Sequence, residues 1–97
     1  MAFIQIIDFR TKRLEEGRPY IDEYMAKTEG RRTVQRSVLC QDRDDTDHYM
    51  NIVFFDSYEA AVTNSNMPET TELATKLSAL SDSPDTFYNL EVIDDRS

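Results

Sequence analysis

The 97-residue sequence has no tryptophan, one cysteine, one histidine, two glycines and three prolines. The single cysteine, Cys40, excludes a disulfide within the chain, so a reducing cytoplasm is the expected location. No apolar run approaches the roughly 20 residues of a membrane-spanning helix. The N-terminus also lacks a basic stretch followed by a long apolar segment, so no secretory signal is predicted.

Positive charge is scarce as well. The chain has 11 Lys and Arg against 19 Asp and Glu, a net charge of −8. Nucleic acids and anionic membranes are bound by clustered cations, so we expect neither as a partner. Apolar residues make up 39% of the chain, which suffices for a single globular domain over residues 1–97. A chain this short buries a small core, and association with a second copy is the expected way to complete it.

The sequence is organised around a strand predicted at His48–Phe55, HYMNIVFF. Both of its faces are largely apolar, so both need cover. Asp56 is predicted to end this strand and to cap a helix, with Glu59 at the spacing of a capping box.

The other elements alternate around this strand. Further strands are predicted at Ala2–Arg10, Arg31–Gln41 and Phe87–Ile93. A first helix should begin at Pro19 and end at Gly30. A second should span residues 58–80 in two pieces, because Pro68 and the polar residues before it interrupt it near residues 65–67. We expect that break to border the mouth of any pocket.

This order, strand–helix–strand–strand–helix–strand, predicts an α+β, ferredoxin-like subunit with an antiparallel sheet. Its two helices cover one face of the sheet, with the stripe Leu73, Leu77 and Leu80 lying on it, and a second subunit should cover the other. In the second strand, Val34, Val38 and Cys40 are expected on one face with Arg36. The acidic turn Asp42–Asp47 lacks the glycine and glutamate of a calcium loop, so we expect a solvated hairpin and no metal site.

The run Phe55–Ala61, FDSYEAA, resembles the strand-end corner of the antibiotic biosynthesis monooxygenase-like domains. With NSNMPET and DTFYNLEV, the likeness is nearest to small uncharacterised actinobacterial members. It implies a homodimeric α+β barrel with a pocket between the sheet and the helices of each subunit. In some members this pocket carries out cofactor-free oxidation of aromatic polyketides, and in others it binds or degrades haem. Asn64 and Ala74 occupy the positions of the haem-degrading branch's helix tryptophan and haem-ligating histidine, so the resemblance implies no cofactor here.

Three residues are candidates for catalysis. His48 titrates near neutral pH and is a candidate general base, or it is an exposed histidine paired with Asp45 or Asp47. Asn51 interrupts an apolar strand, and its amide must bind either protein groups or a ligand. Asn64 either orients a substrate carbonyl or ends a helical segment.

Three further residues are candidates for substrate binding. Arg36 could hold an anionic substrate or pair with a neighbouring strand. Asp8 could serve the site as a base on the first strand, or it is a solvated strand-edge residue. Tyr58 is either at a site or packing. The function predicted is a cofactor-independent monooxygenase-like protein acting on a small aromatic molecule of polyketide or quinol type. The alternative is a non-catalytic homodimer that binds a small molecule or a protein partner.

Overall fold

The computed structural model describes residues 2–97 and has four strands and three helices. In chain order these are β1 (Phe3–Arg10), α1 (Leu14–Thr28), β2 (Val34–Gln41), β3 (His48–Phe55), α2 (Tyr58–Ser65), α3 (Pro68–Ser78) and β4 (Thr86–Glu91). No helix within residues 2–97 has the length and apolar character needed to cross a membrane.

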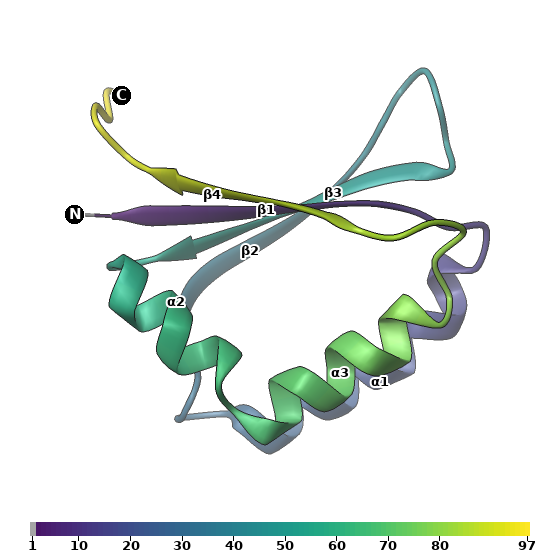
Figure 1. Cartoon of the computed structure of the whole chain (residues 1–97), viewed down its shortest axis with the longest axis horizontal. Coiled ribbons are helices and arrows are strands. Elements are labelled where there is room, and N and C mark those ends of the chain that lie inside the picture. The colour runs from purple at the N-terminus through teal and green to yellow at the C-terminus, as the bar shows by residue number, and fades with distance from the viewer. Residues whose placement is uncertain (1) are drawn as a thin grey trace.

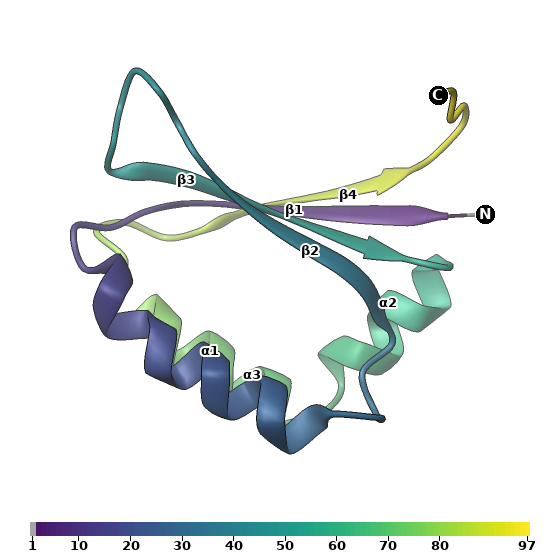
Figure 2. The ribbon, with the colours of Figure 1, turned by 180° about the vertical axis from the view of Figure 1, so that it is seen from behind.

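The four strands form one antiparallel sheet in the order β2-β3-β1-β4. All three helices lie on one face of it, and the other face carries none (Figures 1 and 2). This is the predicted ferredoxin-like α+β arrangement. The bounds predicted for β3 are confirmed, because its β-branched and aromatic residues form a strand from His48 to Phe55.

The hydrophobic core lies at one end of the sheet, under α2. Phe3, Val53, Phe55 and Ala61 are buried there, and Val34 packs against them. The register aligns Phe3 of β1 with Phe55 of β3, so these large side chains meet directly on the helix-covered face. The tilted rings have centroids 6.4 Å apart. The opposite end of the same face is where α1 and α3 lie.

Helix α1 begins five residues before the predicted start, at Leu14, so Pro19 lies inside it. A proline in a helix interior removes one backbone hydrogen bond. Pro19 is exposed, so the carbonyl of Glu15 that loses this partner can face solvent. Gly30 has φ +80° and follows the helix end, as predicted.

The predicted break between α2 and α3 is confirmed, since α2 ends at Ser65 and α3 begins at Pro68. The predicted cap of α2 was wrong by one residue. Ser57 is the N-cap, and its hydroxyl accepts a hydrogen bond from the Ala60 amide at 3.1 Å. The Asp56 carboxylate instead accepts a bond from Gln35 on β2.

A β-bulge in β2 corrects the predicted faces of that strand. The register shifts between Val34 and Arg36, because β2 advances by two residues where β3 advances by one. Val34 therefore points to the helix-covered face, where it joins the core, while Arg36 and Val38 point to the open face. Ser37 and Leu39 then share the helix-covered face with Asn51.

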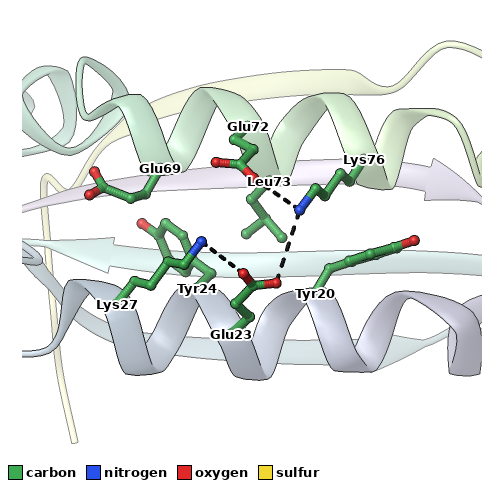
Figure 3. Close-up of a pocket in the computed structure, with 8 residues that line it drawn as sticks. All are labelled: Tyr20, Glu23, Tyr24, Lys27, Glu69, Glu72, Leu73 and Lys76. Atoms are coloured by element: carbon green, nitrogen blue, oxygen red, sulfur yellow. Dashed lines mark ion pairs between the residues drawn. The ribbon is translucent and has the colours of Figure 1, made fainter.

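Helices α1 and α3 lie side by side and are joined by a charged seam (Figure 3). Glu23 of α1 pairs with Lys27 at 2.7 Å and with Lys76 of α3 at 4.0 Å, and Lys76 also pairs with Glu72 at 3.0 Å. The hollow between the helices measures about 20 Å³, room for a single water. We interpret the seam as structural. Leu73 of the predicted stripe lines this hollow, while Leu77 and Leu80 line the space between the helices and the sheet.

Candidate functional site

A cavity of about 340 Å³ separates the sheet from α1 and α3, at the end of the sheet away from the core. This volume lies at the lower end of the range of small-molecule sites. Its walls are largely apolar. The apolar residues that line it are Ile7, Phe9, Leu14, Ile21, Leu39, Ala74, Leu77, Leu80 and Phe87. The two long helices thus face the sheet across a cavity, at the place where the resemblance implied a pocket, whereas the leucine stripe of the second helix was expected to lie directly on the sheet.

The wall contributed by α1 follows one helical stripe. Leu14, Gly17, Arg18 and Ile21 recur at i, i+3, i+4 and i+7 and all line the cavity. Gly17 is buried, and a Cβ there would lie 3.0 Å from a methyl carbon of Leu77. The absence of a side chain at Gly17 therefore permits the close approach of α3 beside the cavity.

The floor of the cavity carries one polar pair, Ser37 of β2 and Asn51 of β3. The Ser37 hydroxyl donates a hydrogen bond to Asn51 Oδ1 at 2.9 Å. This bond fixes the amide with its nitrogen free, and Nδ2 has no hydrogen-bond partner among residues 2–97. An amide N–H₂ in an apolar cavity is a ready donor to a ligand carbonyl or phenolate oxygen.

A second polar group lines the cavity from the α3–β4 loop. Asp85 accepts a hydrogen bond from the Ser81 hydroxyl at 3.1 Å, and both residues line the cavity. Thr11 closes the same region, because its buried hydroxyl donates to the Leu80 carbonyl at 2.6 Å. Asp85 is the one acidic side chain among the residues that line the cavity within the described chain.

Two arginines complete the lining. Arg13 precedes α1 and pairs with Glu16 at 2.8 Å, and Arg18 pairs with Glu15 at 2.8 Å. All four side chains are more than half exposed. Because both arginines line the cavity, the two exposed ion pairs lie at its rim. The guanidinium of Arg13 lowers the pKa of the Glu16 carboxyl.

His48 and Asp8 come together, but on the open face of the sheet and outside the cavity lining. His48 Nε2 lies 2.7 Å from Asp8 Oδ1, and Nδ1 lies 2.9 Å from Asp42 Oδ2. The hydrogen bonds to Asp42 and then to Asp8 raise the pKa of His48 above its usual value. The partners are therefore Asp42 and Asp8, where Asp45 or Asp47 was expected. Arg10 pairs with Asp45.

Asn64, Arg36 and Tyr58 also lie outside the cavity lining. Asn64 is buried at 6% exposure and links three segments, since it donates to the Tyr24 hydroxyl at 3.3 Å and accepts from the Thr33 amide at 3.4 Å. The guanidinium of Arg36 lies 5.5 Å from the centre of the Phe54 ring on the open face. Residues 64–67 do not line the cavity either, so the expectation that the α2–α3 break forms its mouth is not met.

Of the six predicted site residues, the structure therefore brings only Asn51 to the cavity. Sequence reasoning missed Ser37, Asp85 and the two rim arginines. Arg18 had a usable signal, because it occupies an apolar stripe once the helix is taken to begin at Leu14. Ala74 lines the cavity from α3, and no histidine among residues 2–97 does, so these residues offer no imidazole ligand for haem.

Neither a protein-family model nor a curated protein matches this sequence. Solved structures do resemble it. SnoaB, a cofactor-independent oxygenase from Streptomyces nogalater, has a TM-score of 0.79 at 19% identity over 97% of this chain and 95% of its own. An antibiotic biosynthesis monooxygenase has a TM-score of 0.75 at 18% identity, covering 97% and 100%. A conserved protein from Methanosarcina mazei has a TM-score of 0.80 at 10% identity, covering 93% and 91%.

The TM-scores of 0.75 to 0.80 establish the fold. The similarity runs along nearly the whole of each chain. It therefore includes the strand order and the helix placement described above. The resemblance first drawn from the corner at residues 55–61 is thus confirmed at the level of architecture. The chain has the ferredoxin-like fold of the antibiotic biosynthesis monooxygenase-like proteins.

Proposed function

We propose that this protein is a cofactor-independent monooxygenase acting on a small aromatic molecule of polyketide or quinol type. The observation that carries the proposal is the apolar cavity of about 340 Å³ with one oriented amide, Asn51, in its floor. An aromatic ring suits the apolar walls, and an oxygen substituent suits the free amide nitrogen. The fold shared with the oxygenase SnoaB supports the same conclusion.

The reaction is the conversion of a ring methylene flanked by phenolic rings to a carbonyl, with dioxygen as oxidant. Loss of a proton from the methylene gives a carbanion, which adds to dioxygen and forms a peroxide anion. The second C–H bond and the O–O bond then break, giving the carbonyl and hydroxide. The proton first removed returns to this hydroxide, so one CH₂ and one O₂ yield one C=O and one water. An apolar cavity favours the step because it keeps water from quenching the anion.

Two cavity residues have roles in this scheme. Asn51 donates from Nδ2 to the substrate oxygen on which negative charge develops, with Ser37 holding its orientation. Asp85 is the proton acceptor that the cavity offers, where the sequence had favoured His48. The substitution Asn51→Ala should lower kcat about 10²- to 10³-fold, the cost of removing one such donor. Asp85→Asn should lower kcat about 10²- to 10⁴-fold, and His48→Gln should leave it within about twofold.

The test is oxygen uptake by metal-stripped protein with a panel of hydroxyanthrones, followed by mass spectrometry of products formed under ¹⁸O₂. We expect one labelled oxygen in each quinone. Turnover that is absent across the panel, or unchanged by both Asn51→Ala and Asp85→Asn, contradicts the proposal. A large loss of kcat in His48→Gln alone would instead assign the role of base to His48, on the open face of the sheet.

We also propose that two copies pair through the open faces of their sheets. This face carries apolar residues from all four strands, and Tyr88 and Leu90 are more than 40% exposed there. A small core under one end of the other face leaves the chain in need of further burial. Sedimentation at micromolar concentration should show a dimer, and Ile6→Lys in the centre of the open face should give a monomer. Met25→Lys, on an exposed position of α1, is the matched control.

The alternative is a homodimer that binds a small molecule without turning it over. The observation in its favour is that Asp85 is the one carboxylate that lines the cavity, and that among residues 2–97 no histidine, cysteine or lysine joins it. Under this alternative, hydroxyanthrones bind and raise the melting temperature, but oxygen uptake does not exceed the protein-free rate.

A further inference from the structure

The open face of the sheet, which no helix covers, is arranged in rows that cross all four strands (Figure 1). Its central row is entirely apolar or aromatic and consists of Val38, Ile52, Ile6 and Tyr88. The row toward α2 consists of Arg36, Phe54, Ile4 and Leu90. The row on the other side consists of Cys40, Met50, Asp8 and Thr86. The charged side chains of this face therefore lie on either side of an apolar centre.

Arg36 is an exposed cation of this face that makes no ion pair with any residue from 2 to 97. Its guanidinium lies 5.5 Å from the centre of the Phe54 ring. The other arginine of the face, Arg10, pairs with Asp45. An arginine buried under apolar surface without a carboxylate is strongly destabilising. A second copy that covers this face must therefore bring a carboxylate to Arg36.

The opposite end of the same face has an excess of negative charge. Asp8 and Asp42 share a single histidine, His48, so the three groups stay net negative whether or not the imidazole is protonated. The excess persists when the whole hairpin end is counted. Five aspartates there, Asp8, Asp42, Asp44, Asp45 and Asp47, face three cations, Arg10, Lys12 and Arg43.

Asp42 is the carboxylate of this cluster that is best placed to accept a further donor. Its side chain is 35% exposed, against 22% for Asp8. Oδ1 accepts a hydrogen bond from the Asp44 amide at 2.8 Å, and Oδ2 lies 2.9 Å from His48 Nδ1. A carboxylate has about four acceptor positions, so these two contacts leave room for a guanidinium. Asp42 also follows Arg36 by an even number of residues, and its contact with His48 places it on the open face.

Two-fold symmetry allows two ways of stacking these faces, because the axis of an isologous pair lies in the plane between the sheets. If the axis runs along the strands, β2 faces β4 of the other copy and β3 faces β1. Arg36 then meets a strand whose residues on this face are Thr86, Tyr88 and Leu90, none of them acidic. The acidic clusters of the two copies, which include residues of β1 and β3, come together and repel.

If the axis instead runs across the strands along the central row, each strand faces its own counterpart in the opposite direction. The row of Arg36 then lies on the row of Cys40 of the other copy. Asp42 is two residues further along that strand, roughly 7 Å, which the long arginine side chain spans. This second arrangement joins opposite charges and separates like charges.

We propose that two copies stack with the two-fold axis across their strands, and that Arg36 of each copy pairs with Asp42 of the other. The apolar central rows pack on one another, and the two symmetry-related ion pairs flank them along the β2 edge. This inference rests on the proposed dimer and is independent of the proposed oxygenase activity. It names the contacts that fix the orientation of one copy on the other.

The first test measures the dimer dissociation constant by sedimentation equilibrium. Arg36→Glu should raise it about 10²-fold or more, since two buried pairs are replaced by two repulsions. Arg18→Glu is the matched control, because it makes the same charge change on α1, on the other side of the sheet, and should alter the constant by less than about threefold. Arg36→Glu combined with Asp42→Arg exchanges the two charges and should bring the constant back to within about tenfold of wild type.

A second measurement avoids Asp42→Arg, which also removes a partner of His48. In a Cys40→Ser background, Val38→Cys places a thiol on the proposed axis, where it faces the same residue of the other copy. Mild oxidation should therefore give a covalent dimer of this variant alone. With the axis along the strands, Val38 would face Tyr88, so a covalent dimer would form only between Val38→Cys and Tyr88→Cys chains.

The outcomes separate this inference from the proposed dimer. A wild-type protein that is monomeric at micromolar concentration overturns both. A wild-type dimer that Arg36→Glu weakens no more than Arg18→Glu overturns the role of Arg36 and leaves the dimer standing. A covalent dimer that forms only on mixing Val38→Cys with Tyr88→Cys overturns the orientation. Weakening by Arg36→Glu together with a covalent dimer of Val38→Cys alone supports the inference, even if the charge-exchanged protein folds poorly.

Discussion

Replacing Gly17 by alanine tests how firmly α1 and α3 are held against one another beside the cavity. Alanine is favoured over glycine in a helix interior by about 1 kcal/mol. The new methyl group would lie 3.0 Å from Leu77 Cδ2 and 3.5 Å from Leu80 Cδ1, so Leu77 must shift by a few tenths of an ångström. Leu77 borders the cavity and has space to move into. We therefore expect a net gain of about 0.5–1 kcal/mol, where a tight core would turn the same change into overpacking.

Gly30, the other glycine of the chain, is the matched comparison. Its φ is +80°, and a Cβ there would meet nothing within 4 Å. The substitution Gly30→Ala therefore isolates backbone strain, which costs about 1–2 kcal/mol for an alanine in the left-handed region. Thermal unfolding followed by circular dichroism should show opposite shifts. For a domain of this size, 1 kcal/mol corresponds to about 4–8 °C in Tm, upward for Gly17→Ala and downward for Gly30→Ala.

A fall in Tm for Gly17→Ala as large as that for Gly30→Ala would refute this reasoning. It would mean that Leu77 cannot yield and that the cavity wall is rigid. A second readout follows from the same geometry. If Leu77 moves toward the cavity, Gly17→Ala should weaken hydroxyanthrone binding about twofold to threefold while raising Tm, and Gly30→Ala should leave the binding constant unchanged.

Three further changes address the open face, the α1 end and the core. Hydrogen bonds to Asp42 and Asp8 raise the pKa of His48, so its stabilising contribution is complete below the unfolded pKa of about 6.5 and is lost as pH rises through the folded value. The difference in urea midpoint between wild type and His48→Gln should therefore shrink from pH 6 to pH 8.5, and a constant difference would contradict it. Thr28 is 0% exposed and donates to the Tyr24 carbonyl at 2.6 Å, so Thr28→Val should cost about 1–2 kcal/mol in urea unfolding. Phe55→Ala should cost about 3–5 kcal/mol because it empties the core under α2, and a cost below 2 kcal/mol would show that this core is not the centre of stability.

The strands were the most predictable part of the fold. β3 has β-branched and aromatic residues on both faces, and its predicted bounds match the structure. The order of elements then limits the topology to few arrangements, because short connections place sequential strands and helices side by side. Pro68 marked the start of α3 for the same local reason, since its ring suits the first turn of a helix.

Local rules failed where a tertiary contact or a strand irregularity decided the outcome. Pro19 is a good helix start in isolation, yet α1 extends from Leu14 because Leu14 and Gly17 face the cavity and α3. The bulge before Arg36 carries no proline or glycine, and it moves Val34 to the other face from Val38. A one-residue shift of this kind inverts every assignment on one side of it.

The candidate site was the least predictable part, because side chains from separate elements meet there. Asn51 could be found as a polar interruption of an apolar strand. Asp85 and the rim arginines lie in or beside segments whose polar composition is ordinary for surface positions. His48, the only histidine, attracted attention by its pKa, but its position in β3 directs it to the open face with Asp8.

The distribution of side-chain size along the sheet accounts for the position of the cavity. At the α2 end the helix-covered face carries Phe3 and Phe55, which fill the space beneath a short helix. At the other end the lining includes large residues such as Phe9 and Phe87, but Ser37 and Asn51 on the sheet and Gly17 on α1 are small or polar. Ser37, Asn51 and Gly17 leave space that the larger lining residues do not fill, and the charged seam holds the two longer helices to each other. The cavity is therefore a consequence of the residues at these three positions. Substitutions that place larger side chains there should fill the cavity before they unfold the domain.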